Sequence, residues 1–436
     1  MKRFDLTVIL SLIMKPAVKR IAGLMSAPLL LGSLLLAPGC TDNEEPDSDP
    51  DKVEPSIRTS ILIYAVASNN LSYDFNNDMA EVLEGAPGID ADKADVWVYS
   101  LTQKQAPTLS RLVWVEDKGE YAFEVRKEYD RKTFSTDPKR ISEVIADYEE
   151  FSQAPQRGLI FWSHATGWTP KFSDHIVADI NESDIMPAAL RSAPVISGSV
   201  EEDPRGWYGQ DIYEGQADYC DLLELDSAIP ESTFDFIWFD CCYMSSIEVV
   251  YQLRHKAPYI VAYPTEMAAE GLPYQITLPY LAAADYDLTE AAKATAQYFL
   301  DKNSVITICV TRTDALEEVA REAAKATEVS SKERPWAINL QKYSRSPSGP
   351  FYDFGQYTSE WGAKLGSDWD EAAFRGAMEK AVVYKAASAT GFDRREIKPE
   401  NFSGLSCHYF YDDSTEETEY YKRLDWWKAV YPAFHQ

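Results

Sequence analysis

Short apolar runs alternate with amphipathic stretches along the chain from Thr59 onward. The apolar runs are nearly continuous in Ile, Val, Leu and aromatic residues, which is typical of strands that are buried on both faces. They lie at 60–66, 95–101, 111–117, 158–163, 234–239 and 258–264. Because such strands alternate with helical stretches, the pattern predicts an α/β protein whose largely parallel sheet is covered on both faces.

Helical spacing of the apolar residues marks most of the stretches between these strands. Predicted helices lie at 72–84, 141–153, 220–230 and 245–256. The C-terminal part mixes predicted helices at 287–302, 313–327, 374–387 and 420–434 with strand-like segments at 305–310 and 405–411. Residues 169–206 hold four prolines and show no regular period, so they are predicted to form a long loop.

The N-terminus has the order of a secretory signal. Basic residues precede an apolar run and then LAPGC, which ends at Cys40. The apolar run is short for a transmembrane helix, and an uncleaved anchor helix is the alternative. Small residues directly before a cysteine resemble the lipobox of bacterial lipoproteins. We therefore expect residues 1–39 to be a lipoprotein signal peptide, Cys40 to be lipidated, and 40–57 to be an acidic, solvated tether.

The distribution of charge agrees with an exported protein. The acidic stretch after the cysteine resembles the surface-export signal of Bacteroidota lipoproteins, so the expected location is the outer surface of the cell envelope. The net charge is −28, and because the first 39 residues carry five basic groups and one acidic group, the rest carries −32. Such a surface repels nucleic acid and attracts cationic ligands. The charge therefore argues against binding to nucleic acid.

The composition is that of a folded protein with free thiols. Hydrophobic residues make up 45% of the chain and aromatic residues 13%, which argues against disorder. The five cysteines beyond Cys40 are an odd number at irregular spacing, and this is a poor disulfide framework. No spacing of Cys and His indicates a zinc site. We therefore expect at least one free thiol.

Reactive residues follow two of the predicted strands. His164 follows GLIFWS, and Asp240, Cys241 and Cys242 follow FDFIWF. Ligands of parallel α/β sheets bind at the carboxyl ends of the strands, and a cysteine peptidase needs a thiol, a histidine and two backbone donors for the oxyanion. On position alone, His164 pairs with either cysteine, and a structural histidine is the alternative. The other histidines are less well placed for catalysis. His175 lies in the long loop, His255 and His435 are expected to be solvated, and a core or sheet-edge role is expected for His408.

Two segments resemble sequence elements of the clostripain family of cysteine peptidases. GLIFWSHATGW at 158–168 is similar to an apolar strand followed by His-Gly-Ser/Thr-Gly-Trp, and FDFIWFDCCYMSSIE at 234–248 is similar to the element Phe-Asp-Ala-Cys-Leu-Met. Supporting similarities lie, in the family's order, at 59–71, 259–274 and 402–411. The resemblance implies a caspase- and gingipain-like three-layer α/β/α sandwich with a C-terminal α+β extension. It divides the chain into a peptidase core at 58–280 and a C-terminal subdomain at 281–436.

The resemblance also implies a role for each site residue. His164 matches the catalytic histidine, and Cys242 matches the nucleophile, because Cys241 occupies the family's alanine position. Asp240 matches the acid of the S1 pocket, which favours Arg or Lys before the cleaved bond; a helix N-cap is the alternative for this residue. The backbone N–H groups of Ala165 and Cys242 match the oxyanion hole. Cys241 is then a small buried residue that fills space.

One departure from the family pattern opens a second interpretation. Alanine stands at position 165, where the family has glycine, and a positive φ there would cost about 1 kcal/mol. The alternative function is therefore an inactive relative that binds peptides or glycans as a surface-anchored lipoprotein. No catalytic group is missing, so a peptidase acting on proteins or peptides with basic residues is the preferred interpretation.

The resemblance carries two further expectations about maturation and metal. Members of the family are often cut between the two catalytic elements, and the loop at 169–206 offers Lys171, Arg191 and Arg205 as basic cleavage points. Some members depend on calcium, although the Cys/His chemistry requires no cofactor. No EF-hand-like spacing of ligands occurs, so no calcium ligand is named from the sequence.

Overall fold

The computed structural model describes residues 56–168, 207–327, 340–343, 351–365, 369–392, 394–408 and 416–431. They belong to one compact unit, Glu54–Gln436. The predicted signal peptide, Cys40, nearly all of the tether and the loop at 169–206 lie outside the described residues, as do His175 and His435. Within the described part of the chain, no helix has the length and apolar character needed to cross a bilayer.

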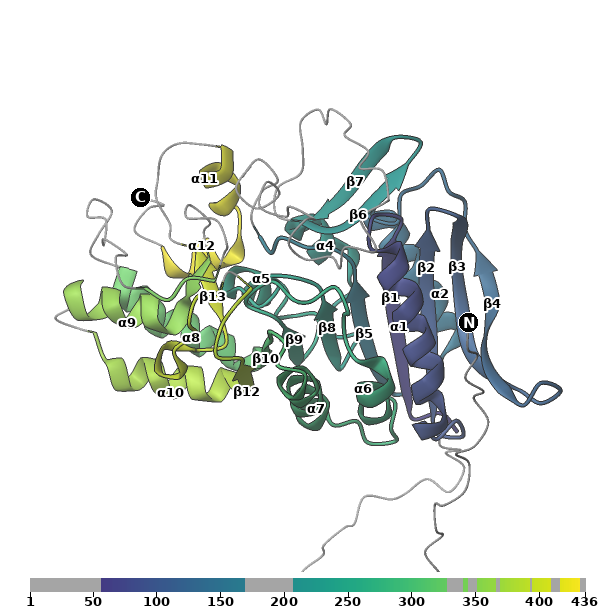
Figure 1. Cartoon of the computed structure of the whole chain (residues 1–436). Coiled ribbons are helices and arrows are strands. Elements are labelled where there is room, and N and C mark those ends of the chain that lie inside the picture. The colour runs from purple at the N-terminus through teal and green to yellow at the C-terminus, as the bar shows by residue number, and fades with distance from the viewer. Residues whose placement is uncertain are drawn as a thin grey trace, which may run out of the picture. The chain divides into compact units, whose positions relative to one another are not determined.

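A nine-stranded sheet forms the centre of this unit, in the order β12-β10-β9-β8-β5-β1-β2-β3-β4 (Figure 1). The inner strands β9, β8, β5, β1 and β2 are parallel to one another, and β10, β12, β3 and β4 add to the sheet in antiparallel fashion. The strands span Thr59–Ala67 (β1), Ala94–Thr102 (β2), Gln105–Val115 (β3), Glu120–Glu128 (β4), Gln156–Trp162 (β5), Phe236–Asp240 (β8), Tyr259–Ala262 (β9), Thr307–Arg312 (β10) and Val382–Ala387 (β12). The largely parallel sheet expected from the sequence is confirmed.

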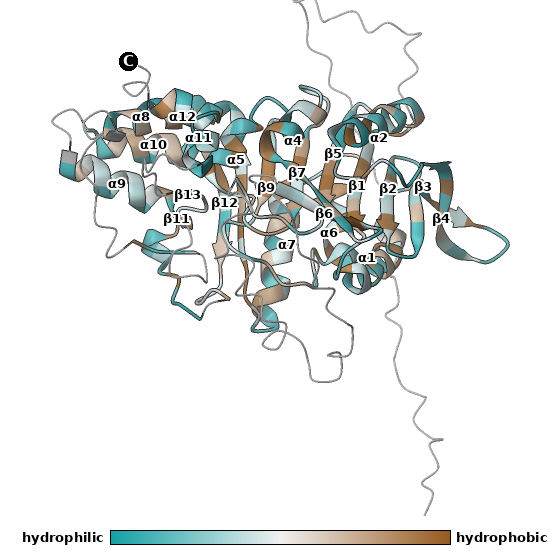
Figure 2. Ribbon diagram, turned by 90° about the horizontal axis from the view of Figure 1, so that it is seen from above, coloured by the Kyte–Doolittle hydropathy of each residue, from teal (hydrophilic) through white to brown (hydrophobic). Residues whose placement is uncertain are grey.

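Helices cover both faces of the sheet, as Figure 2 shows from above. One layer consists of α1 (Ser72–Gly85), α6 (Tyr274–Leu281) and α7 (Leu288–Asp301). The other layer includes α2 (Pro138–Phe151), α4 (Leu222–Ala228), α5 (Ile247–Gln252) and α8 (Leu316–Thr327). The other α-helices of the described residues are α9 (Phe354–Leu365), α10 (Glu371–Ala381), α11 (Glu416–Tyr421) and α12 (Asp425–Val430). The fold is therefore a three-layer α/β/α sandwich, as expected.

Strand β1 shows why the apolar runs form the middle of the sandwich. All nine of its residues are buried. Leu62, Tyr64 and Val66 pack into the core on the α2 side, whereas Ile61 and Ile63 pack into the core on the α1 side. Each fully buried side chain of this size contributes about 1.5–3 kcal/mol from removal of apolar surface from water. A nearly continuous apolar run is what a strand with two buried faces requires.

The predicted helix at 374–387 was wrong in its second half. The helix α10 ends at Ala381, and Val382–Ala387 forms β12, which pairs with β10 along one side of the sheet. Valine and tyrosine favour strands, but only the neighbouring strand supplies the hydrogen bonds that make this segment extended. Two strands from the part of the chain beyond residue 281 thus belong to the central sheet.

Two other helices differ in their bounds from those predicted, and in each case the local sequence or backbone gives the reason. The predicted helix at 220–230 begins at Leu222, because Asp221 caps it in a capping box with Glu224. The aromatic helix expected at 420–434 is divided into α11 and α12, since Leu424 is extended. Strand β4, the hairpin of β6 (Trp207–Tyr213) and β7 (Gln216–Asp221), and the pair β11 (Phe351–Asp353) and β13 (Ser406–His408) complete the described strands. β4 is largely exposed, so it lacks the apolar signal of a buried strand.

Candidate active site

The two candidate catalytic residues follow neighbouring strands of the sheet. β5 and β8 are parallel neighbours in which Trp162 pairs with Asp240. His164 lies two residues beyond the first partner and Cys242 two residues beyond the second. The register of the sheet therefore brings both residues to the same edge, at the carboxyl ends of the strands, where ligands of such sheets bind.

The loop that carries His164 is fixed on both sides. Ala165 forms an isolated antiparallel bridge with Tyr208 of β6, in which the Thr166 N–H donates to the Trp207 carbonyl at 3.1 Å and the Gly209 N–H donates to the His164 carbonyl at 2.9 Å. The Ala165 amide takes no part in these two hydrogen bonds. It is therefore compatible with the role of an oxyanion donor, which stays a prediction.

The positive φ considered for Ala165 occurs instead at two neighbouring positions, Gly167 and Tyr243. Ala165 does not have a positive φ; Gly167 does, at 65°. A Cβ at Gly167 would lie 2.9 Å from the Tyr243 carbonyl oxygen, so this glycine allows the loop after β5 to contact the loop after β8. Tyr243, directly after Cys242, has a φ of 61° although it is not glycine. Its N–H donates to the Thr265 carbonyl at 3.0 Å, which helps to hold this conformation.

His164 is half-buried and contacts Asn70. Its Nε2 lies 2.7 Å from Asn70 Oδ1. The surrounding protein atoms desolvate the ring and lower the pKa of His164 to about 4. The imidazole is therefore neutral at neutral pH and can accept a proton. Asn70 was missed as a site residue, although it lies in the segment at 59–71 that supported the family resemblance.

The two adjacent cysteines have opposite environments. Cys242 is half-buried, and its Sγ accepts a hydrogen bond from the Met267 N–H at 3.4 Å. Cys241 is 1% exposed, its Sγ lies 3.9 Å from the Phe161 carbonyl oxygen, and burial raises the pKa of its thiol well above the usual value. A neutral, inaccessible thiol is a poor nucleophile. The core position of Cys241 is what its match to the family's alanine led us to expect.

Among the described residues, the other cysteines are buried, and the other two histidines lie away from Cys242 in the sequence and differ in exposure. All five cysteines in the described residues are free, and Cys220, Cys309 and Cys407 are buried with Cys241. His255 is exposed. The ring of His408 packs 4.4 Å from that of Trp168, and its backbone N–H donates to the buried Glu248 at 2.8 Å. His408 is half-buried and is the last residue of β13, in agreement with the core or sheet-edge role expected from the sequence.

Asp240 is a buried acid on the opposite face of the sheet from Cys241. It is 3% exposed. Its Oδ2 accepts hydrogen bonds from the Leu272 N–H at 3.1 Å and the Tyr274 hydroxyl at 2.9 Å, whereas its Oδ1 is buried without a partner in the described part of the chain. Burial raises the pKa of Asp240 to about 7. The N-cap interpretation was wrong, because Ser246 caps α5.

A second buried acid, Asp78 of α1, lies beside Asp240. Its Oδ2 accepts a hydrogen bond from the Trp162 indole N–H at 2.6 Å. Burial, together with the charge of Asp240, raises the pKa of Asp78 to about 9. Gly271 lies against both acids, because a Cβ there would be 2.6 Å from Asp78 Oδ2 and 3.3 Å from Asp240 Oδ2. Nothing in the sequence singles out Asp78, since it lies on a helix far from either motif.

One loop contacts both the thiol and the acid. Between β9 and α6, Met267 donates its N–H to Cys242, and Leu272 donates its N–H to Asp240. Among the described residues, no group of three or more His, Cys, Asp or Glu side chains is arranged to hold a metal ion. We therefore assign no calcium ligand to the described part of the chain.

Comparison with known proteins identifies the family. The sequence profile of the clostripain family, peptidase C11, matches residues 63–181 and 199–430. A search of curated proteins found no match. The fold is similar to that of an inactive zymogen C11 protease from Parabacteroides distasonis, with 26% identity, a TM-score of 0.67, and coverage of 87% of this chain and 99% of that one.

Two structures of a secreted C11 cysteine protease from Bacteroides thetaiotaomicron show the same fold. One, in complex with an irreversible peptide inhibitor, is 22% identical with a TM-score of 0.68 and covers 86% of this chain and 99% of that one. The other, described as iotapain, is 21% identical with a TM-score of 0.67 and covers 86% of this chain and 100% of that one. Because the family profile spans most of the sequence, the chain belongs to the clostripain family of cysteine peptidases.

Proposed function

We propose that the protein is a cysteine endopeptidase that cleaves after Arg or Lys, with Cys242 as nucleophile and His164 as general base and acid. Membership of the family supports the reaction class. The observation that carries the preference for basic residues is the Asp240 carboxyl group, which is 3% exposed and has one oxygen without a partner in the described part of the chain. A buried unpaired carboxylate oxygen is costly unless a ligand supplies a donor.

The reaction follows from the two side chains. His164 takes the thiol proton of Cys242, and the thiolate attacks the carbonyl carbon of the substrate to form a C–S bond. The N–H groups of Ala165 and Cys242 stabilise the oxyanion. As the C–N bond breaks, His164 gives its proton to the leaving amine. Water then loses a proton to His164 and attacks the thioester, which releases the acid product and restores the thiol.

The specificity pocket has to open before substrate binds. The loop from Thr265 to Leu272 contacts Cys242 and Asp240, and Gly271 lies directly against the acid. A guanidinium or ammonium group that reaches Asp240 forms a charge-assisted hydrogen bond with Oδ1. The cation also stabilises the ionised form of the acid, so substrate binding lowers the pKa of Asp240.

Maturation and anchoring form the rest of the proposal. The protein is made as a precursor that is cut within 169–206, at Lys171, Arg191 or Arg205. This part of the proposal is supported by the Parabacteroides distasonis relative, whose structure is described as an inactive zymogen. Cleavage after residue 39 and lipidation of Cys40 would attach the enzyme to the outer membrane. Mass spectrometry of the N-terminal peptide from cells tests the anchor, because Cys40→Ala should abolish the lipid-modified species.

Fluorogenic peptides that end in Arg, Lys, Leu or Asp test the activity, with and without calcium. We expect turnover of the Arg and Lys peptides by the wild-type chain and by Cys241→Ala, and none by Cys242→Ala. Turnover that survives Cys242→Ala would refute the nucleophile. If no peptide is turned over but basic peptides bind, the protein is the peptide-binding relative instead. An intact chain that hydrolyses the Arg peptide would show that processing is not required.

A further inference from the structure

We propose that Asn70 is a positioning residue that holds the His164 ring in the tautomer protonated at Nε2, which leaves the Nδ1 lone pair to take the thiol proton. This inference rests on the proposed function, because it assigns a partner to the general base. Asn70 does not touch the substrate in this scheme; it acts through His164.

The hydrogen bond itself selects the tautomer. Asn70 Oδ1 lies 2.7 Å from His164 Nε2. A carbonyl oxygen only accepts hydrogen bonds, so Nε2 has to carry the proton, and a neutral imidazole has a single N–H. Nδ1 is then the basic nitrogen. Without this acceptor, the proton divides between the two nitrogens, and the fraction of chain with the correct base falls.

The amide oxygen also favours the charged form of the ring. When Nδ1 takes the thiol proton, the imidazolium of His164 is in an environment whose desolvation disfavours a charge. The hydrogen bond from Nε2–H to Asn70 Oδ1 becomes a charge-assisted one in that state, and such bonds are about twice as strong as neutral ones. Asn70 therefore stabilises the ion pair that carries out the attack more than it stabilises the resting state.

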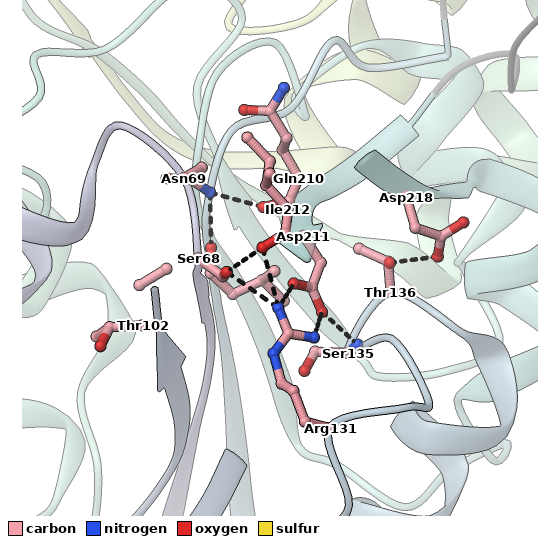
Figure 3. A network of polar contacts seen from close by, with 12 residues as sticks. Ser68, Asn69, Thr102, Arg131, Ser135, Thr136, Gln210, Asp211, Ile212 and Asp218 are labelled. Atoms are coloured by element: carbon pink, nitrogen blue, oxygen red, sulfur yellow. Dashed lines mark hydrogen bonds and ion pairs between the residues drawn. The ribbon is translucent and has the colours of Figure 1, made fainter. Parts of the chain in front are cut away.

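The turn that carries Asn70 is held by the residue before it. The Asn69 side chain donates to the Gln210 carbonyl at 2.8 Å (Figure 3). It also donates to the Val66 carbonyl at 3.0 Å, and its Oδ1 accepts from the Leu71 N–H at 2.9 Å. Asn69 is 1% exposed. The backbone on both sides of Asn70 is thus fixed, which a positioning residue requires.

A buried ion pair ties this turn to the hairpin of β6 and β7. Arg131 binds both carboxylate oxygens of Asp211, which is completely buried, and donates to Ser68 Oγ at 3.0 Å (Figure 3). Asp211 Oδ2 also accepts from the Ser135 N–H at 2.8 Å. β6 begins at Trp207, directly after the loop at 169–206. The orientation of the general base therefore depends on three segments, from β1, from the β4–α2 connection and from β6.

Kinetics of position-70 variants test the inference in the full chain. Asn70→Ala should lower kcat for the Arg peptide about 10- to 100-fold and leave KM within about twofold, because the ring loses orientation but the substrate pocket is intact. Asn70→Asp keeps an acceptor oxygen and should retain kcat within about fivefold. Its negative charge should move the acid limb of the kcat/KM profile about one pH unit higher. Asn77→Ala, an exposed asparagine of α1, is the control and should match the wild type.

Two results would overturn the inference in an active enzyme. The first is an Asn70→Ala variant with the kcat of the wild type. The second is an Asn70→Asp variant that loses as much kcat as Asn70→Ala and shows no shift of the pH profile. A purely structural role of Asn70 predicts this second result. The ¹⁵N shifts of the His164 ring, assigned with His164→Ala, provide a readout without turnover. The Nε2–H form should dominate in the wild type and not in Asn70→Ala. An Nδ1–H form in the wild type would contradict the inference.

The two readouts separate this inference from the proposed function. If no peptide is cleaved and the ring shows the Nε2–H form only when Asn70 is present, the proposed function fails and the positioning role stands. If peptides are cleaved through Cys242 and the ring tautomer does not depend on Asn70, the proposed function stands and the positioning role fails.

Discussion

Trp162 and Asp240 are register partners on the parallel strands β5 and β8, and each is close to the buried Asp78. Trp162 donates its indole N–H to Asp78 at 2.6 Å, and Asp78 lies beside Asp240 across Gly271. His164 and Cys242 therefore both lie two residues past the paired ends of β5 and β8, and the two acids lie on the side of the sheet that α1 covers. The proposed catalytic residues and the proposed specificity acid thus follow the same two strands, and substitutions can test them separately.

The two adjacent thiols should respond differently to substitution and to alkylation. Iodoacetamide should modify Cys242 first, since it is half-buried, whereas Cys241 is 1% exposed. Cys242→Ala should reduce peptidase activity about 10³-fold or more. Cys241→Ala should keep activity within about twofold and cost about 1 kcal/mol of stability through the lost packing. Peptide mass mapping gives the site, and faster alkylation of Cys241 would contradict the assignment.

Binding of basic substrates should depend on the ionisation of Asp240. Because the pKa of Asp240 is raised to about 7, the acid is largely protonated at pH 6 and largely ionised at pH 8. KM for the Arg peptide should therefore fall severalfold between these pH values, and KM for a Leu peptide should not. Asp240→Asn should remove the difference and raise KM for Arg about 10- to 100-fold. An unchanged preference for basic residues would rule out Asp240 as the S1 acid.

Replacement of Asp78 by asparagine should stabilise the protein at alkaline pH. The pKa of Asp78 is raised from 3.8 to about 9, so the folded state binds more protons than the unfolded state between these values, and stability falls as pH rises through that window. Asp78→Asn removes this dependence. The variant should be more stable by about 1–3 kcal/mol at pH 9 and equal to the wild type near pH 4. Urea unfolding across this range measures the effect; a variant that is less stable at pH 9 would refute it.

Gly271 should be intolerant of a side chain. Its φ is 66°, and a Cβ would collide with Asp78 Oδ2 at 2.6 Å. Gly119 is a matched control, with a φ of 65° and nothing within 4 Å of an added Cβ. Gly119→Ala should cost about 1 kcal/mol from backbone strain alone, and Gly271→Ala should cost about 2 kcal/mol more. Equal losses in thermal unfolding would show that the loop simply moves away.

The ion pair between Arg131 and Asp211 should matter far more than an exposed one. Arg131→Gln leaves a fully buried carboxylate without a charged partner, which costs about 3–5 kcal/mol. Arg126→Gln removes an exposed pair with Glu124 and should cost less than about 0.5 kcal/mol. Arg131→Gln should also lower kcat if the turn at Asn70 loses its support. Equal stability of the two variants would contradict the assigned role.

The sequence by itself predicted a largely parallel sheet covered on both faces, and it placed the candidate site at the carboxyl ends of two strands. Strands buried on both faces need continuous apolar runs, and a reactive residue at the end of such a run lies at the edge where ligands bind; GLIFWS before His164 and FDFIWF before Asp240 both follow this rule. The family resemblance then distinguished Cys242 from Cys241. The segment at 382–387 could not be assigned in this way, because a short, half-exposed strand is defined by its neighbour β10 rather than by its own pattern.

Only the tertiary structure decided which residues surround the reactive groups. Asn70 and Asp78 lie far along the chain from His164 and Asp240, and no sequence pattern links them to those residues. Their contacts arise because β1, which precedes Asn70, lies directly beside β5, and because α1 packs in the same core cluster as Trp162 of β5 and Trp238 of β8. The raised pKa of Asp240 likewise comes from burial and not from residue type. Local periodicity specifies strands and helices, whereas contacts between distant segments depend on how those elements pack.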